Sequence, residues 1–127
     1  AIGIEQLKRI EFFKEKRQLI AKQYIEILSP INEVKFLNLN YEEIVPHIFV
    51  IKVKNRDGLR DYLLKSGIEC GVHYKPNHML KMYSNPLVTL SITESLYSKI
   101  ISLPCHVDLS LLEQDYVIQK IGEFYNA

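Results

Sequence analysis

The sequence predicts an α+β domain in which a small antiparallel sheet of about three strands packs against helices. Apolar residues recur at helical spacing near both ends of the chain, and short runs rich in β-branched and aromatic residues lie between them. The chain has 127 residues, which is the size of one domain. We therefore expect residues 1–127 to form a single folded unit.

Helices are expected where apolar spacing and capping signals agree. The first should run from the N-terminus to Ser29, on a stripe formed by Leu7, Ile10, Phe13, Ile20, Tyr24, Ile27 and Leu28. Another should begin with Asp57 as its cap and end at Gly67 in the left-handed conformation. Ser91 and Ser110 each precede a glutamate by three positions, the spacing of a capping box. The second box opens a helix with the stripe Leu112, Tyr116, Val117, Ile121 and Phe124.

Three strands are expected, over residues 34–39, 47–53 and 69–74. Pro46 stands just before the second run, where its missing amide hydrogen is tolerated. The longest segment without periodicity covers residues 75–90. Long irregular segments often carry function, so this one is of interest.

Composition limits the classes of function. The chain is 47% hydrophobic and 24% charged, with no apolar run near the roughly 20 residues that a membrane helix needs. Its 16 Lys and Arg are dispersed and balanced by 15 Asp and Glu, so neither a membrane nor nucleic acid is an expected partner. Cys70 and Cys105 are too few for a disulfide framework, and no signal-peptide pattern is present. We expect a cytoplasmic protein with reduced thiols.

Groups suited to binding a polar ligand concentrate in the segment GVHYKPNH, which begins at Gly71. Its imidazoles and phenol can hydrogen-bond a ligand while packing on the ligand's apolar faces, and Pro76 excludes a regular helix. His73, Tyr74 and His78 are therefore the candidate binding residues. By residue type alone, one alternative remains: a strand end with one ring in the core and a solvated loop histidine.

Other chemistries fit the spacing poorly. Cys70, His73, Cys105 and His106 could together bind zinc, but the spacing directs the members of each pair to opposite faces of a strand. The same geometry argues against a Cys105 nucleophile with a His106 base. Lys75 precedes a proline in a polar segment, where nothing would lower its pKa for Schiff-base chemistry. No glycine-rich phosphate loop is present. We assign no catalytic residue and no metal ligand.

The segment GVHYKPNH, followed by SLPCH from Ser102, resembles the C-terminal part of the DegT-type (DegT/StrS-like) nucleotide-sugar aminotransferases, which use pyridoxal phosphate. The opening AIGIEQL is similar to the first helix of that part of the family, and the pieces HIFV, RDGL and GI follow in the same order. The resemblance covers nearly the whole chain. It implies the small C-terminal domain of a fold-type I pyridoxal-phosphate-dependent transferase.

The resemblance also implies a parent enzyme larger than this chain. Its cofactor-binding large domain, with the lysine that forms the Schiff base, would lie upstream of Ala1. The parent would be a homodimer that transfers an amino group, usually from glutamate, to a keto sugar carried on a nucleotide. His73, Tyr74 and His78 would contact this substrate, while proton transfer would belong to the absent lysine. We expect the fragment alone to be non-catalytic and to bind no pyridoxal phosphate.

Two alternatives stay open. The chain could be a free-standing α+β module that binds a small ligand or a protein, although it begins without methionine and inside an expected helix. The parent could instead belong to a dehydratase branch of the same family, in which histidine replaces the catalytic lysine. The sugar, the carbon that is aminated and the nucleotide are not specified by the sequence.

Overall fold

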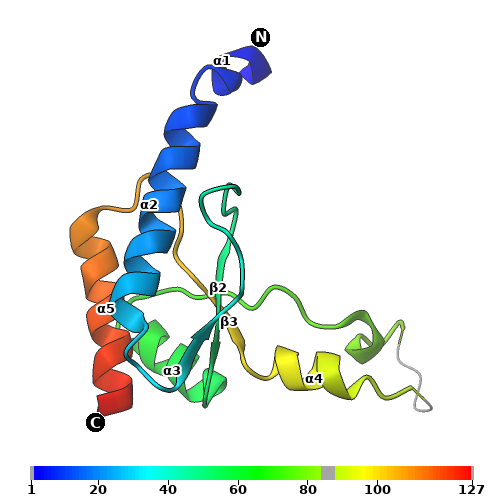
Figure 1. Cartoon of the computed structure of the whole chain (residues 1–127). Coiled ribbons are helices and arrows are strands. Elements are labelled where there is room, and N and C mark those ends of the chain that lie inside the picture. The colour runs from blue at the N-terminus through cyan, green and yellow to red at the C-terminus, as the bar shows by residue number, and fades with distance from the viewer. Residues whose placement is uncertain (1, 84–87, 127) are drawn as a thin grey trace.

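The computed structural model describes residues 2–83 and 88–126 and has the predicted α+β architecture with a three-stranded antiparallel sheet. In chain order the elements are α1 Ile2–Leu7, α2 Ile10–Leu28, β1 Val34–Phe36, β2 Phe49–Val53, α3 Arg56–Lys65, the 3-10 helix η1 Asn77–Met79, α4 Ser91–Tyr97, β3 Ile100–Leu103 and α5 Leu111–Asn126. Helices α2 and α5 lie side by side, whereas α4 sits on a segment that reaches away from the body (Figure 1).

The sheet has the order β1-β2-β3, so β2 is the central strand. Side chains alternate between its two faces, and Phe49, Ile51 and Val53 are buried on the inner face. The ring of Tyr24 on α2 stacks on Phe49 with 5.2 Å between centroids. Val50 and Lys52 alternate with these residues and point to the other face of the sheet, which we call the outer face. The helices thus cover one face of the sheet.

Two buried polar groups tie α2 to the C-terminal part of the chain. The hydroxyl of Tyr24 donates to the carbonyl of Pro104 at 3.0 Å, and the Gln114 side chain, 1% exposed, donates to the carbonyl of Ile20 at 2.8 Å. A buried polar group without a partner would cost free energy, so these bonds are what allows both side chains to be buried.

The third strand is not where the sequence predicts it. The predicted strand at residues 69–74 is wrong: this segment forms a single bridge, in which Gly71 and Ser102 exchange both backbone hydrogen bonds, at 3.2 and 2.8 Å. The third strand is β3, which pairs with β2 in the register Phe49 to Leu103. The second neighbour of β2 is therefore β3, and residue 71 reaches only the far edge of that strand. Beyond it, Pro76 has no amide hydrogen to extend a ladder.

The expected first helix is two helices, interrupted at Lys8 and Arg9. Helix α1 has no buried residue, so no packing holds it in line with α2. The predicted end near Ser29 is confirmed, because α2 ends at Leu28. Of the predicted stripe only Ile20, Tyr24 and Leu28 are buried, whereas Ile27 is 45% exposed; Ala1 lies outside the described residues.

Helix α3 begins differently from the prediction. Its N-cap is Asn55, in the left-handed conformation with φ of 54°, and not Asp57, which lies in the first turn. A Cβ on Gly58 would lie 2.5 Å from the Asn55 side-chain amide, which makes no capping hydrogen bond, so a larger residue there would have to displace that side chain. The other end agrees with the prediction, since Gly67 is left-handed with φ of 78°.

The two predicted capping boxes have different outcomes. Before α5, the Ser110 amide donates to Glu113 at 2.8 Å and the Glu113 amide donates to the Ser110 hydroxyl at 3.2 Å, which confirms the box. Before α4 the predicted cap Ser91 is wrong: Ser91 is the first helical residue, and Glu94 accepts instead from the amide of Leu90 at 3.0 Å.

The apolar stripe of α5 is predicted only in part. Val117 and Ile121 are buried, whereas Leu112 is 82% exposed.

Among the described helices, none combines the length and the apolar character of a membrane-crossing helix.

Replacing Ser110 by Ala should destabilise the protein by about 1 kcal/mol, because the Glu113 amide loses the hydroxyl that caps it. Urea unfolding measures this loss. The matched control is Ser91→Ala, which should have an effect within about 0.5 kcal/mol, since Ser91 is not the cap of α4. Equal losses in the two variants would contradict this assignment of the caps.

Candidate functional site

His73 is held against the outer face of the sheet by Ser102 of β3. Its Nδ1 lies 2.8 Å from the Ser102 hydroxyl, and Ser102 itself is 5% exposed. The imidazole packs directly over Gly71, where a Cβ would overlap the ring. The backbone bridge between Gly71 and Ser102, the hydroxyl bond and the missing side chain at Gly71 together determine where the ring lies.

Tyr74 lies beside His73. The two rings meet edge to face, with centroids 5.0 Å apart and an interplanar angle of 85°. Tyr74 is 74% exposed, while His73 is partly buried. The structure therefore brings two of the three predicted site residues together, one anchored to the sheet and the other open to a ligand.

His78 is positioned by a different element. It lies in η1, its side chain is 14% exposed, and its Nε2 lies 3.0 Å from Oε1 of Glu94 on α4. The amide of Leu90 and then the imidazole of His78 hydrogen-bond the Glu94 carboxylate and hold the pKa of Glu94 below its usual value. His78 is thus fixed to α4, and its convergence with His73 and Tyr74 on one ligand stays a prediction.

Ser102 is the site residue that the sequence did not single out. In β3 the side chains alternate, so Ile101 and Leu103 are on the inner face and Ser102 is on the outer face. A serine among apolar residues of a strand was the available signal. Its significance depends on the pairing with Gly71, which is remote in the sequence.

The two thiols are core groups. Cys70 and Cys105 are buried, and burial raises the pKa of both, that of Cys70 to about 12. A thiol with a raised pKa is a poor nucleophile at neutral pH, so both cysteines act as small buried apolar groups. Over the described ranges 2–83 and 88–126, no cluster of three or more His, Cys, Asp or Glu could hold a metal ion.

The described residues do not fit a covalently held pyridoxal phosphate. Schiff-base chemistry needs a desolvated lysine whose pKa is lowered. No lysine in the described part of the chain is buried, and Lys75 is exposed. The pKa of Lys120 is shifted in the opposite direction, because Glu123 hydrogen-bonds its ammonium group. No reaction step can be assigned to this cofactor on these residues.

Replacing Ser102 by Ala should release the His73 ring, because Nδ1 loses the hydroxyl that holds the ring in place. Side-chain NMR should show one set of His73 ring signals in the original protein and shifted, averaged signals in the variant. The free energy of unfolding should fall by about 1 kcal/mol. Ser98→Ala, on α4, is the control and should leave the His73 signals unchanged. An unaltered His73 spectrum in Ser102→Ala would contradict this role.

The bonds to Glu94 should break at acidic pH. A carboxyl whose folded-state pKa is lowered stabilises the fold above its unfolded pKa of about 4.3, and this contribution is lost as pH falls through the lower, folded-state pKa. The Leu90 amide should therefore report a transition centred below about pH 4.3 in NMR. Glu94→Gln should abolish that transition. A midpoint above this value would show that the carboxylate is not held as described.

Comparison with known proteins relates this geometry to a family. Residues 1–122 match the DegT/DnrJ/EryC1/StrS aminotransferase family. A DegT/DnrJ/EryC1/StrS aminotransferase from Brucella abortus is 35% identical with a TM-score of 0.85, over 98% of this chain and 34% of that one. NtdA from Bacillus subtilis, solved with bound cofactor PMP, is 27% identical with a TM-score of 0.90, over 100% of this chain and 32% of that one.

A third similar structure is Helicobacter pylori PseC, an aminotransferase involved in the biosynthesis of pseudoaminic acid. It is 26% identical with a TM-score of 0.87, over 99% of this chain and 36% of that one. The chain thus spans about a third of the length of these enzymes. The resemblance read from the GVHYKPNH and SLPCH segments is confirmed, and the chain belongs to the DegT/DnrJ/EryC1/StrS aminotransferase family.

Proposed function

We propose that residues 1–127 are the C-terminal, substrate-side domain of a pyridoxal-phosphate-dependent aminotransferase. The parent transfers an amino group, from glutamate, to a keto sugar carried on a nucleotide. The observation that carries this proposal is the His73 ring, anchored by Ser102 at 2.8 Å, with the exposed Tyr74 at its edge. Family membership and the PMP in a similar structure support the choice of chemistry.

The role of this domain is to bind and orient the sugar. Because Nδ1 of His73 is bonded to Ser102, the ring presents Nε2 to a ligand. Tyr74 presents an exposed hydroxyl that can donate or accept. His78, held by Glu94, adds a contact from η1. Fixed donors and acceptors around the sugar hydroxyls lower the cost of placing the keto carbon for reaction.

The cofactor chemistry belongs to the rest of the parent. Pyridoxal phosphate, when bound there, supplies the electron sink for amino transfer. The lysine that holds it lies outside this chain in the proposed arrangement, so the chain alone is non-catalytic and carries no pyridoxal-phosphate site. The parent is proposed to be cytoplasmic, with no role in binding nucleic acid or a membrane.

Exposed apolar side chains support a surface that is covered in the parent. On α1 and the first part of α2, the large apolar residues more than 40% exposed are Ile2, Ile4, Leu7, Ile10, Phe12 and Leu19. So many apolar side chains on one segment favour a surface that a partner covers. We assign it to the large domain or to the second subunit of a homodimer. Light scattering of the parent tests the dimer, and a monomeric parent would count against it.

Replacing His73 by Ala in the full-length parent should lower kcat/KM for a keto nucleotide-sugar by the equivalent of about 1–3 kcal/mol, because one ligand hydrogen bond is lost. The melting temperature should change little. His106→Ala, at an exposed histidine that lines a different pocket, is the matched control. The isolated chain, assayed in parallel, should give no turnover.

The opposite pattern would contradict the proposal. Normal kinetics in His73→Ala, together with a large loss of thermal stability, would show that the ring is a packing element. Turnover by the isolated chain, with a borohydride-reducible imine at one lysine, would show that the cofactor site lies within these 127 residues.

A further inference from the structure

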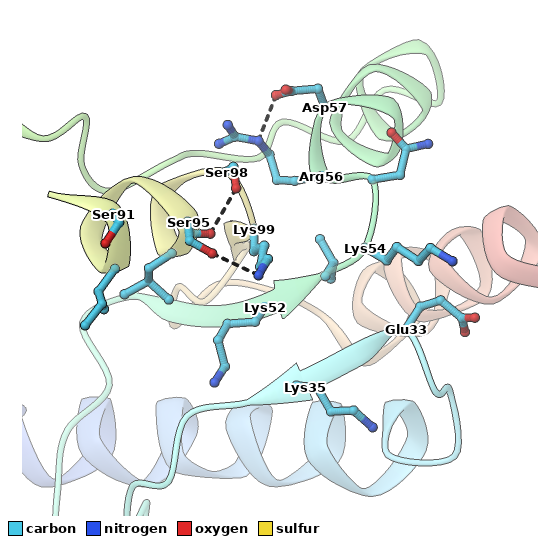
Figure 2. A pocket seen from close by; sticks show the side chains of 14 residues that line it. Glu33, Lys35, Lys52, Lys54, Arg56, Asp57, Ser91, Ser95, Ser98 and Lys99 are labelled. Carbon is cyan, nitrogen blue, oxygen red and sulfur yellow. Dashed lines mark hydrogen bonds and ion pairs between the residues drawn. The ribbon is translucent and has the colours of Figure 1, made fainter. Parts of the chain in front are cut away.

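A groove of about 880 Å³ opens between the sheet and α4 (Figure 2). Its walls come from β1 and the residue before it, the end of β2, the start of α3, and α4 with the two residues that follow it. None of His73, Tyr74 and His78 lines it. The groove is therefore a separate feature, and an inference about it does not rest on the proposed function.

Two lysines face each other across the strands that form one wall. Lys35 on β1 and Lys52 on β2 are direct cross-strand partners, and both line the groove. Like charges directly opposite each other destabilise a strand pair. In the described part of the chain, no ion pair joins a carboxylate to either lysine. Figure 2 shows the two ammonium groups pointing apart; because lysine stems are flexible and neither group is ion-paired to a described residue, both can turn toward one anion.

Protection of a sheet edge does not explain this arrangement. Lysines on edge strands prevent sheets from adding further strands, which suffices for Lys35 on β1. Lys52 lies on the central strand and is half-buried, where such protection has no purpose. Burying part of a lysine stem costs side-chain entropy, so the charge at this position calls for another reason.

The acidic residues of the groove do not neutralise its lysines. Asp57 Oδ1 lies 2.7 Å from Nε of Arg56, whose side chain is 7% exposed. The two form an ion pair without a hydrogen bond at Nε, so Asp57 compensates the charge of Arg56. The other carboxylate of the groove, that of Glu33, compensates at most one of four lysines: Lys35, Lys52, Lys54 and Lys99. The groove has an excess of positive charge.

The remaining walls are suited to the organic part of a ligand. Val53, Ile92 and Leu96 contribute apolar surface, and the hydroxyl of Ser95 holds the Lys99 ammonium at 3.0 Å. Neighbouring strands are about 4.8 Å apart, so two facing lysines can reach the same phosphate or adjacent phosphates. We propose that this groove binds an organic phosphate of the nucleoside diphosphate type, with its phosphates on Lys35 and Lys52.

The test uses the full-length parent and ADP as the probe, with inorganic phosphate in a second arm. Calorimetric titration should show saturable ADP binding, and hydrogen exchange should slow in peptides from β1, β2 and α4. The double variant Lys35→Met/Lys52→Met should weaken ADP binding at least tenfold. Lys65→Met, which removes an exposed lysine at the end of α3, should leave it unchanged. Inorganic phosphate should bind at the same peptides but more weakly.

The controls separate this groove from the sugar site. His73→Ala should keep the ADP affinity, and the double lysine variant should keep the KM for a keto nucleotide-sugar. A raised KM in the double variant would show that the groove is part of the substrate site and would overturn the proposal of a separate one. Unchanged ADP affinity in the double variant, or protection only elsewhere, would overturn the phosphate site itself. The phosphate site would also be overturned if an acidic peptide slowed hydrogen exchange in β1, β2 and α4 and ADP did not.

Discussion

The bridge between Gly71 and Ser102 is the contact on which the candidate site depends. Two backbone hydrogen bonds and the bond from Ser102 to His73 attach an irregular segment to the edge of a small sheet. The inner face of that sheet is occupied by α2 and its stacked Tyr24, so the fold is stabilised on one side. The outer face is left for polar groups, and both the His73 ring and the facing lysines lie there.

Local signals in the sequence predicted the features that depend on neighbours in the chain. The capping box at Ser110 and the left-handed Gly67 require only residues within one turn. The prediction of a third strand at residues 69–74 was wrong because strand pairing depends on residues that are remote in the sequence. Residues 69–74 and the strand β3 both have a composition that favours strands, and only the place beside β2 decides which one forms a ladder. Strand pairing is a tertiary property that composition does not contain.

In the candidate site, too, the sequence predicted some residues but missed the contacts that join remote parts of the chain. Residue type and the family resemblance together selected His73 and Tyr74, which the structure places in ring contact. Their anchor is remote, since Ser102 is 29 residues from His73, and the spacing of a single sequence does not indicate such a pair. The facing lysines were missed for the same reason, because their relation depends on the register between β1 and β2. Asn55 was missed as a cap because its left-handed backbone is uncommon outside glycine.

The most direct measurement is a crystal structure of the full-length parent with its cofactor and a keto nucleotide-sugar. We predict that His73 keeps its bond to Ser102 and that Nε2 of His73 or the hydroxyl of Tyr74 lies within hydrogen-bond distance of the sugar. A sugar that contacts neither ring, or a His73 ring turned away from Ser102 into the protein interior, would contradict the claim that this face of the sheet forms one wall of the substrate site.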